Sequence, residues 1–145
     1  MSTSPPVLVG TESFAAIQRE VCSTLADELA PIKVYDYVPE KAEAPYVVWN
    51  TAWGAERDTL NGTADRVWFQ IDVWSTYRGY KEATEIADRI VRRLGHSIAC
   101  LDGYSTIHLL LEQGHSTRDP DGRHRRIALT FHSPYVSPLQ GAGGH

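Results

Sequence analysis

The stretch Arg66–Ser75 reads RVWFQIDVWS and carries the clearest strand pattern in the chain. Successive side chains of a β-strand point to opposite faces of the sheet, so every second residue shares a face. One set of alternate residues is apolar and predicts a buried face: Val67, Phe69, Ile71 and Val73. The opposite face carries Trp68, Gln70, Asp72 and Trp74. Two tryptophans are unusual on a sheet face left in water, which predicts that another segment or another subunit covers this face.

The segments on both sides of this strand give the remaining elements. Apolar side chains recur at helical spacing in two segments and predict helices over residues 11–29 and 80–94. β-Branched and aromatic residues, bounded by proline, glycine and polar residues, predict four more strands over residues 32–38, 45–52, 105–113 and 123–132. The resulting order is α-β-β-β-α-β-β. Strands in runs, with two helices at intervals, predict an α+β fold: a two-layer sandwich with both helices packed on one face of a mainly antiparallel sheet.

The length of 145 residues is that of one ordinary domain. We expect residues 11–136 to form this domain. Residues 1–10 include two adjacent prolines and predict a flexible N-terminal arm, and the glycine-rich residues 137–145 predict a flexible C-terminal tail. Two polar stretches, residues 54–65 and 114–122, predict long loops between strands.

The composition excludes several classes of protein. The formal net charge of −4 argues against a dedicated nucleic-acid binder, which usually carries a basic surplus. No stretch approaches the roughly 20 apolar residues that a bilayer span needs, and the start of the chain does not resemble a signal peptide. The two cysteines, Cys22 and Cys100, lie in apolar segments, and we expect reduced, structural thiols.

Histidine and carboxylate side chains gather before the last predicted strand, as a metal site would require. They are His115, Asp119, Asp121 and His124. Their spacing matches no common zinc pattern. With Gly122 at the sixth place of a calcium loop, Thr117 and Ala128 would fill the first and last places, where carboxylates are needed. We therefore interpret Asp119-Pro120-Asp121-Gly122 as a hairpin turn and expect neither a metal nor a cofactor.

The sequence also lacks the usual signs of a catalytic centre. It holds no Gly-x-Ser-x-Gly elbow, no phosphate loop and no dinucleotide-binding fingerprint. Neither cysteine lies where a thiolate would be activated. Asp72 leaves two interpretations open: a buried acid of a small hydrolase that works with a histidine, or a carboxylate held by hydrogen bonds or at an interface. We expect no catalytic residue.

A short basic run, Arg123-His124-Arg125-Arg126, follows the predicted turn. It has three interpretations. The run could contact nucleic acid, it could form the solvated stem of a hairpin, or it could make ionic contacts with a neighbouring subunit.

Several separated segments together resemble the tail terminator or tail completion proteins of long-tailed bacteriophages. The segments are Pro45-Tyr46-Val47, Phe69–Ser75, the helix with Glu82-Ala83 and Ile86-Ala87, and Arg118–Gly122 before the closing strand. With the first helix, the resemblance covers residues 11–136, and it depends on the order and spacing of the segments. The glycine-rich C-terminus departs from the shorter members of the family.

The resemblance implies a structural protein of the virion, made in the host cytoplasm and placed in the neck region of the tail. It implies a homo-oligomer, a hexameric ring that caps the tail tube, stops its polymerisation and joins it to the head–tail connector or stopper protein. Neither a membrane nor a cofactor is implied, and DNA would be present only as the passing genome. The family has no catalytic residues to transfer.

For such a ring we expect subunit or partner contacts on the tryptophan face and on the two long loops. The candidate residues are Trp68, Trp74, Arg57, Asp58, Arg118, Asp119, Arg123 and Arg125. Aromatic and arginine side chains often dominate the binding energy of interfaces. Two alternatives to the ring protein stay open: an adaptor of the neck that contacts nucleic acid through Arg123, Arg125 and Arg126, and a small hydrolase built on Asp72. The tryptophans could also pack under loops of their own subunit.

Overall fold

The computed structural model describes residues 11–56, 65–95, 97–99 and 107–136. Along the chain the elements are α1 (Thr11–Leu29), β1 (Lys33–Tyr35), β2 (Tyr46–Glu56), β3 (Asp65–Ser75), α2 (Lys81–Leu94), β4 (Ser97–Ala99), β5 (Ile107–Arg118) and β6 (Arg125–Val136). The predicted α+β class and the order α-β-β-β-α-β-β are confirmed. The short strand β4, between α2 and β5, is an addition that the sequence pattern did not predict.

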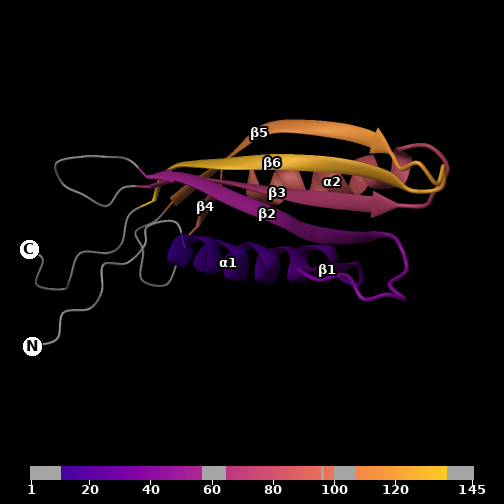
Figure 1. The fold of residues 1–145 in the computed structure, drawn as a ribbon, viewed down its shortest axis with the longest axis horizontal. Helices are drawn as coiled ribbons and strands as arrows, with labels where there is room; N and C mark the ends of the chain where they lie inside the picture. Colours follow the sequence, from indigo (N-terminus) through magenta and orange to yellow (C-terminus); the bar gives the residue numbers. More distant parts are fainter. Residues whose placement is uncertain (1–10, 57–64, 96, 100–106, 137–145) are drawn as a thin grey trace, which may run out of the picture.

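The strands form one sheet in the order β1-β2-β3-β6-β5-β4 (Figure 1). β1 pairs with β2 in parallel, and every other neighbouring pair is antiparallel. The last long strand, β6, therefore lies between β3 and β5 and closes the centre of the sheet. The segments β2–β3 and β5–β6 form two long antiparallel pairs that lie side by side.

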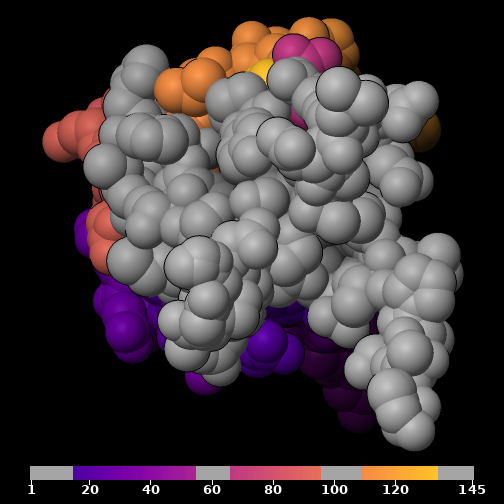
Figure 2. Space-filling view, turned by 90° about the vertical axis from the view of Figure 1, so that its left-hand side faces the viewer, coloured from indigo at the N-terminus to yellow at the C-terminus, as the bar shows by residue number. Residues whose placement is uncertain are grey.

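Both helices pack on one face of this sheet and share a single core with it. The core-facing residues of β3 are the four predicted ones, and each is at most 1% exposed. Their largest fully buried partners come from both helices and from the central strands: Ile17, Leu25, Leu29, Ile90, Leu109 and Phe131. Figure 2, which looks from the left-hand end of Figure 1, places α1 in indigo and β5 in orange on opposite sides of the molecule.

The helices begin and end where their sequences allow. α2 buries one stripe of side chains at helical spacing, Ala83, Ile86, Ala87, Ile90 and Leu94. It carries Glu82 in the first turn and Arg92 and Arg93 in the last turn, and these charges suit the helix dipole. α1 ends at Leu29, just before Pro31, and the backbone N–H of Ile32 donates to the carbonyl of Leu29.

The long strands extend further than the sequence predicted. β2 runs to Glu56 instead of residue 52, and β5 runs to Arg118 instead of residue 113. The predicted loops over residues 54–65 and 114–122 are therefore partly strand. The reason is pairing across the sheet: Gly54 pairs with Val67, and Thr117 pairs with Arg126. Cross-strand hydrogen bonds order these polar stretches, which carry little strand propensity of their own.

β-Bulges change which face a residue occupies. The register of β2 against β3 shifts between Trp49 and Thr51. An extra residue in a strand moves every later side chain to the opposite face. Trp49 is 8% exposed and stacks on Phe69 in the core, whereas Trp53 pairs with Trp68 on the other face and is 42% exposed. A similar shift lies between Leu111 and Gln113 of β5.

Leu111 is less buried than its neighbour on the same face of β5. Leu109 is buried, but Leu111 is 37% exposed, because it lies next to the β-bulge near the edge of the sheet. The side chain of Ile107 lies outside the described residues, as do the predicted arm at residues 1–10, the predicted tail at residues 137–145 and Cys100.

Candidate functional site: the open face of the sheet

The face of the sheet opposite the helices is called here the open face. It is built from alternate residues of β2, β3, β6 and β5, as the strand register shows. Its aromatic and cationic members are Tyr46, Trp53, Arg66, Trp68, Trp74, His115, Arg126 and His132. Such a concentration of tryptophan and arginine differs from the small polar residues that usually cover a solvated sheet face.

Three rings form a row across three neighbouring strands of the open face. Trp53 and Trp68 stack with ring centroids 6.4 Å apart, and Trp68 and His132 stack at 4.8 Å. The guanidinium carbon of Arg66 lies 6.0 Å from the centroid of the Trp68 ring. Trp68 Nε1 donates a 3.1 Å hydrogen bond to Glu112 Oε1. The Trp68 indole N–H is thus satisfied within the chain, while Trp53 leaves a large part of the row accessible.

The environment of His132 favours its neutral form. Burial is the main cause and lowers the pKa of this imidazole below its ordinary value. The Glu112 carboxylate raises the pKa, and the Arg66 guanidinium lowers it. A neutral ring can stack on Trp68 without the cost of removing a charge from water.

Asp72 forms the polar centre of the open face, and its side chain is 3% exposed. Asn50 Nδ2 donates to Asp72 Oδ2 at 2.5 Å, and Gln70 Nε2 donates to Asp72 Oδ1 at 2.9 Å. Arg126 Nη1 lies 3.6 Å from Oδ2 and supplies the opposite charge. These partners come from β2, β3 and β6, so the carboxylate joins three strands. This arrangement matches the hydrogen-bonded carboxylate that the sequence left as one of two interpretations.

Trp74 lies at the other end of the β3 row. The guanidinium carbon of Arg126 is 5.7 Å from the Trp74 ring centroid, and the His124 ring meets it edge-on at 6.0 Å. Trp68 and Trp74 are each partly exposed. Their described neighbours are side chains of their own sheet and of the β5–β6 turn, and these leave both indoles only partly covered.

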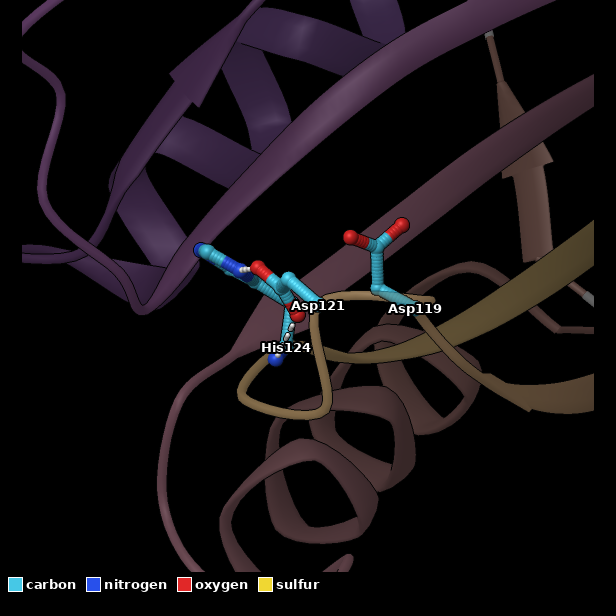
Figure 3. A group of neighbouring side chains, drawn as sticks. All are labelled: Asp119, Asp121 and His124. Carbon is cyan, nitrogen blue, oxygen red and sulfur yellow. Dashed lines mark hydrogen bonds and ion pairs between the residues drawn. The ribbon is translucent and has the colours of Figure 1, made fainter.

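The β5–β6 hairpin ends in the predicted turn. The Asp121 carboxylate accepts hydrogen bonds from the backbone N–H groups of Arg123 and His124, at 2.8 and 3.0 Å, and its Oδ2 lies 2.5 Å from His124 Nδ1 (Figure 3). These bonds hold the pKa of Asp121 well below its usual range. Gly122 adopts φ = 75°, which a glycine tolerates best.

The same turn brings together the only described group of three side chains with metal-ligand chemistry: Asp119, Asp121 and His124, whose ligand atoms lie within 4.8 Å of one another. Figure 3 shows the Asp119 carboxylate standing apart from the Asp121–His124 pair. Asp121 is already engaged by its own turn, so the geometry is accounted for by the hairpin.

The remaining predicted contact residues fall into two groups. Arg118, Asp119, Arg123 and Arg125 lie together at the tip of the β5–β6 hairpin. Arg57 and Asp58 lie outside the described residues. Sequence reasoning missed Trp53, Arg66 and His132. The alternation of β3 and β6 could have placed Arg66 and His132 beside Trp68, but the β-bulge hid the placement of Trp53.

A separate cleft of about 470 Å³ lies between α1 and β1. It is lined by Ala15, Gln18, Arg19, Cys22, Val34 and Asp36. Burial, and to a smaller extent the Asp36 carboxylate, raises the pKa of the Cys22 thiol to about 11. The thiol is therefore protonated at neutral pH and is a poor nucleophile, as expected for a structural cysteine. Asp72 does not line this cleft.

Comparisons with known proteins give the family. The family model of the tail completion protein gp17 matches residues 16–134. None of the curated proteins matches the sequence. Among solved structures, a chain from a virion of a native gene transfer agent particle superposes with a TM-score of 0.76 at 22% sequence identity, covering 90% of this chain and 99% of the other. At this identity, the similarity shows a shared fold.

Within the described part of the chain, neither helix is both long and apolar enough to span a bilayer. The family match extends over most of the chain and includes β3, the turn of the β5–β6 hairpin, all of α2 and most of α1. This chain therefore belongs to the family of tail completion proteins gp17 and is a structural component of a phage-type tail.

Proposed function

We propose that this protein is a tail terminator: copies of it assemble into a ring, six by the family resemblance, that caps the tail tube and joins it to the head–tail connector. The genome would pass through the ring. The protein then acts through its surfaces, by stopping the addition of tube subunits and by presenting a new surface to the connector.

The open face is the observation that best supports this proposal. A sheet with helices on one side only leaves its second side to water or to a partner. Here that side carries the Trp53–Trp68–His132 row and the Arg126–Trp74 pair. Tryptophan and arginine are the residues most often found to dominate binding at protein interfaces. We infer that a neighbouring subunit or the tube covers this row.

The row is suited to an interface for two physical reasons. Its rings are held by their neighbours before any partner arrives, so binding costs little side-chain entropy. Two of the polar groups beneath them are already paired: the Trp68 indole N–H with Glu112, and the Asp72 carboxylate with the amides of Asn50 and Gln70 and the nearby Arg126 charge. A partner can therefore exclude water from Trp68 and Asp72 without leaving them unsatisfied. Three other buried atoms of this face, Arg66 Nε, Arg126 Nε and His132 Nε2, have no hydrogen-bond partner in the described part of the chain.

The experiment combines purified tail tubes, the protein and electron microscopy. Added density at one end of each tube supports the proposal, and tubes that stay bare at both ends contradict it. Light scattering on the free protein gives its oligomeric state in parallel. A Trp53→Ala/Trp68→Ala variant should lose end binding while an Arg93→Ala variant keeps it, because Arg93 is exposed on α2 and lies outside the open face.

A further inference from the structure

A second surface, the arginine cleft, lies between the β3–α2 turn and the tip of the β5–β6 hairpin. It has a volume of about 270 Å³ and is lined by Thr76, Tyr77, Arg78, Gly122, Arg123 and Arg125. Segments more than 40 residues apart in the chain thus bring three guanidinium groups to one small hollow. Guanidinium groups bind carboxylates and phosphates through paired hydrogen bonds.

The three arginines keep most of their donors free. Arg125 is positioned by a 3.2 Å hydrogen bond from Nη1 to the Gly122 carbonyl and by the Tyr80 ring, whose centroid is 5.7 Å from its guanidinium carbon. Neither Arg78 nor Arg123 makes a side-chain hydrogen bond or ion pair with any residue in the described part of the chain. Glu82, the acidic residue nearest in sequence to this turn, instead accepts a hydrogen bond from Ser75.

Charge on the rest of the chain is complementary to this cleft. The residues that line the cleft include three arginines and no carboxylate. Residues 15–45 carry six carboxylates and three cations, and we name this segment the acidic flank. Five of its carboxylates are exposed: Glu20, Asp27, Asp36, Glu40 and Glu43.

The placement of the two surfaces suits a ring. The acidic flank includes β1, an edge strand, and the arginine cleft lies beyond β3 toward β6 and β5 in the sheet order. The β1–β2 connection and the β5–β6 hairpin nevertheless lie at the same, right-hand end of Figure 1. A head-to-tail contact between copies related by rotation joins two different surfaces at the same height, and such contacts can close into a ring.

We infer that the arginine cleft of one copy binds carboxylates of the acidic flank of the next copy. Glu40 and Glu43 are the carboxylates chosen for this contact, because the β1–β2 connection that carries them lies at the same end of the sheet as the cleft. The inference rests on the proposed ring and names a contact within it. A carboxylate is favoured over DNA phosphate because the hollow is small, whereas a run of phosphates is bound by a longer basic surface.

Charge exchange tests this contact. Arg78→Glu/Arg123→Glu places like charges in the contact, and so does Glu40→Lys/Glu43→Lys on the opposite surface. We expect each variant alone to need more than about tenfold higher concentration to assemble than the unmodified protein, because a like-charge pair replaces an attractive one. In an equimolar mixture each reversed cleft meets a reversed flank, so alternating rings should form again.

Light scattering and circular dichroism follow assembly and folding of all proteins, and Arg92→Glu/Arg93→Glu on the exposed side of α2 serves as the control with the same charge change. Assembly of both variants alone, like the unmodified protein, would overturn the inference and leave the ring intact. Loss of binding to a short DNA duplex by Arg78→Glu/Arg123→Glu, with assembly unchanged, would assign the cleft to DNA and overturn it as well. If the unmodified protein neither assembles nor binds tube ends, the proposed function fails too.

Discussion

Trp49 and Trp53 allow the two faces of the sheet to be compared with one residue type. They lie four positions apart on β2, and a β-bulge between them sends their side chains to opposite faces. Trp49 stacks on Phe69 in the core at 4.9 Å, and Trp53 stacks on Trp68 on the open face at 6.4 Å. We predict that Trp49→Ala acts on folding and that Trp53→Ala acts on assembly.

The magnitudes follow from burial. Trp49 is 8% exposed, so its removal leaves a cavity among rigid neighbours and should cost about 3–5 kcal/mol in the free energy of unfolding. For a chain of this size, that loss lowers the Tm by roughly 6–20 °C. Trp53 is already 42% exposed and loses chiefly its stack on Trp68, which is worth about 1 kcal/mol. The Tm should then fall by roughly 2–4 °C.

Urea and thermal unfolding, followed by circular dichroism, measure both variants. The protein must be dilute enough to be monomeric by light scattering, because assembly would raise the apparent stability. At higher concentration, light scattering then measures assembly. Equal losses of stability in the two variants would show that Trp53 is part of the core. Unchanged assembly in Trp53→Ala would show that the open face is not an interface.

Three further predictions concern other parts of the chain. Asp72→Ala should lower the free energy of unfolding by about 3 kcal/mol, because it leaves the Arg126 charge without its partner; urea unfolding measures this, and a loss below about 0.5 kcal/mol would contradict the role given to Asp72. In a Cys100→Ser variant, iodoacetamide should label Cys22 far more slowly at pH 8 than it labels a model thiol, and labelling should rise toward pH 11, because the thiolate forms only near a pKa of about 11; rapid labelling at pH 8 is the contrary result. Gly122→Ala should lower the free energy of unfolding by about 1 kcal/mol, because an alanine is strained at φ = 75° although its Cβ would touch no other atom. Gly79→Ala, at φ = 72° in a turn outside the hairpin, should lower it by a similar amount for the same reason. Thermal unfolding compares the two variants, and an unchanged Tm for Gly122→Ala refutes the strain.

The sequence predicted the buried core and the elements that form it well. Alternation in β3 and helical spacing in α1 and α2 identified buried residues, because burial imposes a strict period on each element. The class, the order of the elements and the turn at Asp119–Gly122 also followed from local chemistry.

The polar strand ends and the open face were harder to predict for a physical reason. The polar ends of β2 and β5 become strands only because β3 and β6 pair with them, and this pairing is not local in sequence. The β-bulge after Trp49 carries no clear sequence signal, so simple alternation would place Trp49 and Trp53 on one face. Trp68 and Trp74 were identified correctly as open-face residues, but the Trp53–Trp68–His132 row became visible only with the strand register.

The surface contacts could be predicted only as a set of candidate loops. Arg78 and Arg123 meet across the arginine cleft because the β3–α2 turn and the β5–β6 hairpin lie at the same end of the sheet. That juxtaposition follows from the insertion of β6 between β3 and β5, which no local pattern specifies.

A cryo-electron-microscopy reconstruction of this protein bound to the end of a tail tube measures the surroundings of the open face directly. We expect a closed ring in which the Trp53–Trp68–His132 row of each copy is buried against a neighbouring chain. A bound protein whose tryptophan row faces only solvent would contradict the account.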